Sequence, residues 1–182
     1  MEDLPMTLRD ELFALFRFCL GSVEAEKRFR EGTGAISART AGSWVKAAYL
    51  DDRTPRYLEA LRQAQSLPMP APPVQVARIL FNRGLFFDAG ECLKPAWKTA
   101  QGREKEVLQG LIQAGAAMHK LELGSDSGCA QLLKEAAAGL AGAEGAGLKA
   151  FGQALEALRP RAERGELKPE EAPQLGSSAL EL

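Results

Sequence analysis

The sequence predicts an all-α protein, a compact multi-helix bundle with a helical N-terminal extension. Three observations support this fold class. Helix-forming residues, above all Ala, Leu, Glu, Arg and Lys, dominate the 182-residue chain. No stretch alternates apolar and polar residues with the period of a strand, and apolar residues recur instead at helical spacing. Because 46% of the residues are hydrophobic, a chain of this length forms a core without disulfides or metal.

A proline-rich segment at residues 66–73 divides the chain. It holds four prolines within six residues, which favours an extended connector and excludes a helix. The connector separates a helical extension, residues 1–65, from a main helical bundle, residues 74–159. Residues 160–182 mix charged residues with Pro, Gly and Ser and have no periodic apolar face, so we expect a flexible tail there.

Three helices are expected in the extension. The first runs over residues 7–30 and ends at the glycines of Gly32-Thr33-Gly34. The second covers residues 37–50. The third starts at Thr54-Pro55, a cap followed by proline, and runs to residue 65.

Five helices are expected in the main bundle. Their ranges are residues 74–83, 86–99, 103–123, 126–140 and 148–158. In the second of them Phe86, Gly90, Leu93 and Trp97 share one face. Pro95 lies within that helix and predicts a kink or a restart.

The helix at residues 103–123 has the strongest pattern and is expected to be central. A core-facing stripe about 100° wide is predicted for Leu108, Leu111, Ile112, Gly115, Met118, His119 and Glu122. The flank of this stripe carries the small residues Gly110, Ala114 and Ala117, which would allow a second helix to approach closely.

Composition excludes several classes of function. One histidine and three scattered cysteines (Cys19, Cys92 and Cys129) cannot supply a Cys/His zinc site or a paired disulfide framework. The net charge of −1 gives no overall attraction for nucleic acid or for an anionic membrane. Because the N-terminus lacks the layout of a secretory signal and the cysteines are unpaired, we expect a cytoplasmic protein with no membrane partner.

The segment from Phe81 to Trp97 resembles the signature of the domain-of-unknown-function family numbered 309. That signature reads Phe-Asn-x-Gly, an aromatic residue, Ala-His-Glu-x-Leu-Glu and Trp, and a second block reads Gly-Leu-Ile-Gln. The resemblance spans about residues 76–141 and rests chiefly on Phe81, Asn82, Gly84, Gly90, Leu93, Trp97, Gly110 and Gln113. It implies a small all-helical bundle and brings no established activity or cofactor.

Two departures from the signature bear on function. Gly90 stands where the family has His, and Lys94 stands where it has the second Glu. A His and a Glu four residues apart would form a polar pair on one helix face. Acid–base or metal chemistry that uses this pair is therefore lost or rebuilt here. Gly90 leaves two alternatives, an open pocket or a close crossing of another helix.

The preferred functional hypothesis is a non-catalytic binding or scaffolding protein without a cofactor, whose partner is another protein or a second copy of the chain. The alternative is a hydrolase-like or metal-binding protein that uses His119, Glu91 and Glu122. A hydrogen-bonded core histidine is the simpler interpretation of His119. Asn82, near a helix end, is expected to bond backbone groups of the next turn.

Residues 35–62 suggest a third hypothesis, a helix-turn-helix-like segment that binds DNA. Three arginines, Arg53, Arg56 and Arg62, follow the expected turn and could contact phosphates. A helical hairpin whose Trp44 covers the main bundle explains the same pattern. Residues 1–65 hold ten basic and ten acidic residues, and this balance favours the hairpin over a nucleic-acid partner.

Overall fold

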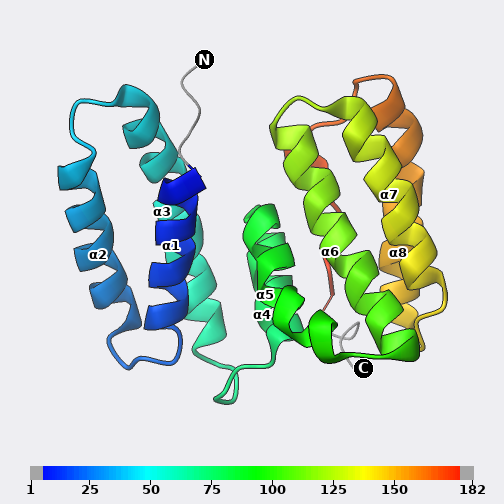
Figure 1. Cartoon of the computed structure of the whole chain (residues 1–182), viewed down its shortest axis with the longest axis horizontal. Coiled ribbons are helices and arrows are strands. Elements are labelled where there is room, and N and C mark those ends of the chain that lie inside the picture. The colour runs from blue at the N-terminus through cyan, green and yellow to red at the C-terminus, as the bar shows by residue number, and fades with distance from the viewer. Residues whose placement is uncertain (1–5, 177–182) are drawn as a thin grey trace. The chain divides into compact units, whose positions relative to one another are not determined.

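The structure is a computed structural model that describes residues 6–176. Within this range the regular structure consists of eight α-helices and one 3-10 helix, without a strand (Figure 1). Their bounds are α1 (Met6–Cys19), α2 (Ala25–Arg39), α3 (Trp44–Ala64), α4 (Pro73–Asn82), α5 (Phe86–Thr99), α6 (Gly102–Glu122), α7 (Asp126–Ala141), α8 (Ala146–Glu163) and η1 (Pro169–Glu171). The predicted all-α fold class is confirmed. None of these helices is long and apolar enough to cross a membrane.

The chain divides between Pro72 and Pro73 into two compact units, which are described separately. In the first unit α1, α2 and α3 lie side by side with alternating direction (Figure 1). Tyr57 of α3 is fully buried, and its ring centroid lies 5.5 Å from that of Phe16 and 5.5 Å from that of Phe29. One aromatic side chain from each helix thus forms the centre of this core.

The predicted break at Gly32-Thr33-Gly34 is wrong, because α2 runs through these residues to Arg39. The chain turns earlier, where Gly21 has the positive φ of 82° that favours glycine. Gly32 serves packing instead, since a Cβ there would lie 2.6 Å from Leu15 Cδ2. Lack of a side chain lets α1 approach α2 at this point.

The two helices expected at residues 37–50 and 54–65 are also wrong. Residues 37–39 end α2, and a single helix, α3, starts after Ser43, whose side chain accepts a hydrogen bond from the Lys46 backbone N–H. Pro55 lies inside α3 and leaves the carbonyl of Asp51 without its usual helical donor. The exposed position of Asp51 makes this interruption tolerable.

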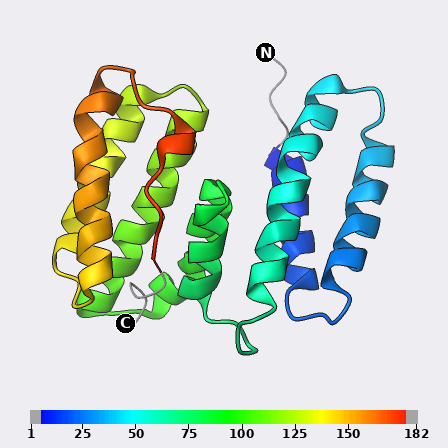
Figure 2. The same cartoon turned by 180° about the vertical axis from the view of Figure 1, so that it is seen from behind.

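In the second unit α6 is the central helix, as predicted. Helices α5 and α7 pack on α6, α8 packs on α7, and α4 packs on α5 (Figures 1 and 2). The helices from α4 to α7 begin and end within one residue of the expected bounds. Pro95 lies inside α5, which continues to Thr99.

The buried face of α6 is centred closer to its small residues than the predicted stripe was. Its buried residues are Val107, Leu108, Gly110, Leu111, Ala114, Gly115, Ala117, Met118 and Leu121. His119 and Glu122, predicted to face the core, are only half-buried. Helices α6 and α7 cross at Gly110 and Gly139, where a Cβ on Gly139 would lie 3.0 Å from Gly110 Cα. The predicted close approach on this flank is therefore confirmed, and it draws the buried face toward α7.

The end of the chain differs from the expected flexible tail. Helix α8 continues through Pro160 to Glu163, and residues 164–176, which we call the strap, run back along α6 (Figure 2). Leu167 and Leu175 of the strap are buried, with exposed fractions of 5% and 3%. Burial of these two leucines is the physical reason that the strap packs against the bundle. Residues 177–182 of the expected tail lie outside the described residues.

Candidate functional site

His119 and Glu122 lie together near the end of α6. Their Nδ1 and Oε2 atoms are 3.2 Å apart, and both side chains are partly covered, with exposed fractions of 22% and 14%. The His119 ring also meets the Phe87 ring edge-on, at a centroid distance of 5.2 Å. The histidine is thus held in place by a carboxylate one turn away and an aromatic ring, which fits the structural interpretation.

Glu91, the third predicted member of an acid–base or metal site, has a different partner. It forms an ion pair with Lys94, one turn along α5, and the Lys94 side chain is 47% exposed. Over residues 6–176 no three His, Cys, Asp or Glu side chains are grouped so that they could hold a metal ion. The structure therefore brings His119 to Glu122 and Glu91 to Lys94, and it assembles no metal site from the three predicted residues.

Gly90 is neither a pocket nor a tight crossing. A Cβ built there would lie 3.7 Å from the Ile112 carbonyl oxygen and 3.9 Å from Ile112 Cγ2, which are ordinary van der Waals distances. The tight point between α5 and α6 is at Gly115, where a Cβ would lie 2.7 Å from the Phe86 carbonyl oxygen. Both open alternatives for Gly90 are therefore wrong.

Other signature residues hold helices together. Phe81 packs edge-on against Phe86 and Phe151, with centroids 5.0 Å and 5.4 Å away. Leu93 is buried, and Trp97 lies under the ammonium group of Lys105 at 5.0 Å. These contacts are structural and carry no reactive group.

Gln113 links α6 to α7. Its side-chain amide donates to Glu135 Oε2 at 2.7 Å, and Gln131 donates to the other oxygen of the same carboxylate at 2.7 Å. The Glu135 carboxylate thus accepts two amide hydrogen bonds in a part-buried place.

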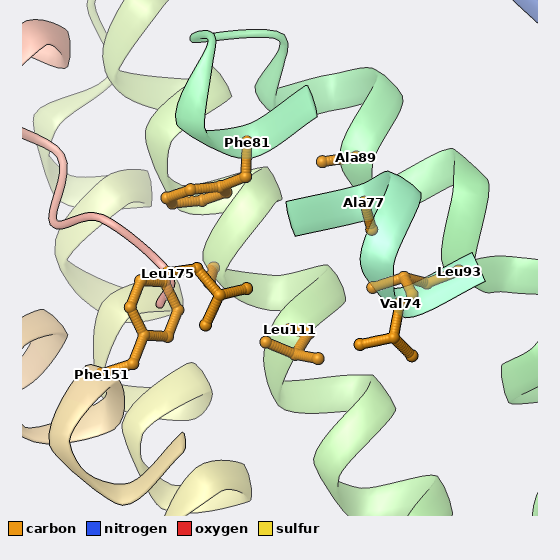
Figure 3. A pocket seen from close by; sticks show the side chains of 9 residues that line it. Val74, Ala77, Phe81, Ala89, Leu93, Leu111, Phe151 and Leu175 are labelled. Atoms are coloured by element: carbon orange, nitrogen blue, oxygen red, sulfur yellow. The ribbon is translucent and has the colours of Figure 1, made fainter. Parts of the chain in front are cut away.

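An apolar pocket lies among α4, α5, α6 and α8, and Leu175 of the strap forms part of its wall (Figure 3). We call it the Leu175 pocket. Its lining residues are Val74, Ala77, Phe81, Ala89, Leu93, Leu111, Ala114, Phe151 and Leu175. With Leu175 in place the remaining cavity is about 10 Å³, room for one water molecule. The lining holds no titratable group, so the pocket suits an aliphatic side chain.

Asn82, the last residue of α4, binds the backbone of the strap. Its Nδ2 donates to the Leu175 carbonyl oxygen at 3.0 Å, and its Oδ1 accepts from the Leu175 N–H at 2.9 Å. The expectation that Asn82 bonds the next turn is therefore wrong, because its partner is 93 residues away in the sequence. One amide satisfies both backbone groups of one residue, and the side chain of that residue enters the pocket.

Part of this site lies in a segment that matches a known protein family. Residues 74–132 match the family model described as domain of unknown function (DUF309). This segment is similar to the DUF309 family. The match confirms the predicted resemblance, and it covers α4, α5, α6 and the start of α7. No curated protein and no solved structure matches the chain.

The matched segment contains Asn82 and seven of the residues that line the pocket, whereas Phe151 and Leu175 lie outside it. We call the two hydrogen bonds between Asn82 and the Leu175 backbone the Asn82 clamp. Sequence reasoning found Asn82 and Phe81 as signature residues and missed Leu175. The available signal was weak: Leu167 and Leu175 are two isolated leucines in a polar segment that also holds Pro169 and Pro173.

The segment at residues 35–62 is a helical hairpin of α2 and α3 that run in opposite directions (Figure 1). A helix-turn-helix joins its two helices at about 90–120°. The three arginines of the DNA-binding hypothesis are ion-paired, Arg53 and Arg56 with Asp52 and Arg62 with Glu26. Trp44, the first residue of α3, is 79% exposed, and its expected contact with the main bundle stays a prediction.

Proposed function

We propose that the second unit, residues 73–176, is a non-catalytic binding or scaffolding domain and that the Leu175 pocket is its binding site. The observation that carries the proposal is the nature of the pocket. Eight apolar residues of the helices line it together with Leu175, its lid, which belongs to a strap without helical structure at that point. The lid can leave without unfolding a helix. We place the protein in the cytoplasm, because Cys19, Cys92 and Cys129 form no disulfide within residues 6–176.

A small apolar probe tests the pocket in the full chain. In a Leu175→Ala variant the lid keeps its backbone and Cβ but loses its isopropyl group, and isovaleramide carries an isopropyl group on a short amide in solution. We expect isovaleramide to shift the methyl NMR signals of Val74, Leu93 and Leu111, with much weaker shifts in the wild type. Leu123→Ala, at a side chain that is 65% exposed, is the matched control.

Two outcomes contradict the proposal. One is an unchanged methyl spectrum of Leu175→Ala up to the solubility limit of the probe, with native helicity retained. The other is steady turnover of any substrate that is lost in His119→Ala or Glu91→Gln, since that result would assign catalysis to the α5 and α6 side chains.

A further inference from the structure

The way Asn82 holds Leu175 has the chemistry of peptide recognition. A side-chain amide offers one donor group and one acceptor, and here both engage the N–H and C=O of a single residue. Such contacts are independent of sequence, because every residue except proline carries the same two groups. The pocket beneath then selects the side chain, which is the division of labour in recognition of extended peptides.

The strap is laid on the bundle as an extended ligand would be. Leu175 is buried while its neighbours Gln174 and Gly176 are exposed, and Pro173 is half-buried. This alternation is typical of an extended chain with one face on a surface. Residues 172–176 have no helix or strand of their own, so their conformation depends on the contacts of Leu175.

We propose that the Leu175 pocket and Asn82 bind an extended, leucine-bearing segment of a partner protein, and that the strap occupies this site in the isolated chain as an internal competitor. The proposal rests on the proposed binding function and names its ligand. The reference ligand is the strap itself, in which Leu175 follows Pro173 and Gln174 and precedes Gly176.

The short link between α8 and Leu175 gives the strap an advantage over a segment of another molecule in competition for the pocket. Only 11 residues separate Glu163, where α8 ends, from Leu175. A short flexible tether gives an effective concentration of about millimolar. An identical segment on another molecule at micromolar concentration would therefore lose to the strap by about 1,000-fold. A natural partner must bind more tightly than the strap or meet the chain when the strap is released.

A second contact holds the strap closed. Arg161 of α8 forms an ion pair with Glu171 at 2.8 Å and donates a hydrogen bond to the Glu166 carbonyl oxygen at 3.0 Å. Both groups are partly exposed, so a partner or a change of conditions can reach them. Release of this contact would weaken the hold on the strap and leave the residues that line the pocket unchanged.

The test uses a fluorescent peptide, acetyl-Ala-Pro-Gln-Leu-Gly with a C-terminal dye, and the full chain with Leu175→Asp. A carboxylate is rejected by the apolar pocket, so the strap of this variant leaves its site. We expect the peptide to bind Leu175→Asp by fluorescence anisotropy and to bind the wild-type chain at least 10-fold more weakly. Replacement of leucine by alanine in the peptide should weaken binding roughly 10- to 100-fold.

Variants of the clamp complete the test. In the Leu175→Asp background, Asn82→Ala should weaken peptide binding by roughly tenfold, because two hydrogen bonds are lost. Gln75→Ala, a polar substitution on the same helix outside the pocket, is the control and should leave binding unchanged. Circular dichroism checks that both variants keep their helices.

Three results would overturn the inference. The first is binding of isovaleramide to Leu175→Ala without binding of the peptide to Leu175→Asp, which leaves the proposed function standing and removes the peptide. The second is equal peptide affinity with and without Asn82→Ala. The third is a wild-type dimer that becomes monomeric in Leu175→Asp, because the partner would then be a second copy that exchanges straps.

Discussion

Gly90 and Gly115 lie on opposite sides of the same helix contact and should respond differently to the same added methyl group. Gly90→Ala places a Cβ at 3.7 Å and 3.9 Å from its nearest neighbours, both in Ile112. Gly115→Ala places one at 2.7 Å from the Phe86 carbonyl oxygen, a backbone atom that cannot turn away. The pair separates the effect of helix propensity from the effect of packing.

The expected magnitudes follow from two terms. Alanine in place of glycine in a helix stabilises by up to about 1 kcal/mol, and at Gly90 nothing opposes this gain. At Gly115 the same gain is opposed by overpacking, which costs about 1–3 kcal/mol. We therefore expect Gly90→Ala to raise the free energy of unfolding by about 1 kcal/mol and Gly115→Ala to lower it by about 1–2 kcal/mol.

The assay is urea unfolding followed by the fluorescence of Trp97, which belongs to the second unit. A Trp44→Phe background removes the only other tryptophan, whose side chain is largely exposed in the first unit. Thermal melts of the same variants should shift by about 3–4 °C for each kcal/mol. A destabilised Gly90→Ala, or a Gly115→Ala as stable as the wild type, would refute the assigned geometry of α5 against α6.

Three further predictions concern other parts of the chain. Gly139→Ala should destabilise the second unit by about 1–3 kcal/mol in the same assay, because its Cβ would lie 3.0 Å from Gly110 Cα and 3.0 Å from the Glu106 carbonyl oxygen; equal stability would contradict the close crossing. Burial, helped by the charge of Asp126, raises the pKa of the Cys129 thiol to about 11. A disulfide reagent at pH 8 should therefore label half-buried Cys92 in the folded chain and Cys129 only after denaturation. Cys92→Ser should abolish the native-state labelling. The hydrogen bond from Arg161 lowers the pKa of Glu171 in the folded chain. The Arg161–Glu171 contact therefore stabilises the strap fully above the ordinary glutamate pKa of about 4.3, and this stabilisation is lost as the pH falls through the lower folded pKa. Strap release, measured by the Leu175 methyl signal, should rise in acid, and Glu171→Gln should flatten this dependence.

The helices of the second unit could be predicted from the sequence because local signals coincide there. Apolar residues recur at helical spacing, and Gly84, with a φ of 70°, ends the first helix where the pattern stops. In the first unit the same kind of signal misled. A glycine either ends a helix or lets a neighbour approach, and Gly32 does the second because Leu15 packs against it. The partner helix decides, and its position is not a local property.

The site shows the same limit. Asn82 stands out in the sequence, but its hydrogen-bond partner is 93 residues away, and no local rule connects them. Leu167 and Leu175 are two isolated leucines in a polar segment, and two positions are too few to define a helical or strand period. Their burial follows from the surface that the bundle offers, so it could not be inferred before the arrangement of the helices was known.

The departures from the family signature at Gly90 and Lys94 lie on α5, whereas Asn82, which matches the signature, lies at the end of α4. At Gly90 this chain lacks the ring that the signature carries, and Lys94 directs its charge to Glu91. On α5 the His–Glu pair of the signature is thus replaced by Gly90 and by the ion pair of Glu91 with Lys94. Asn82, which matches the signature, makes two hydrogen bonds to a segment beyond the family match. In this chain the polar side chain of the signature at the end of α4 holds the backbone of Leu175, and Val74 and Leu111 line the apolar pocket together with the Leu175 side chain.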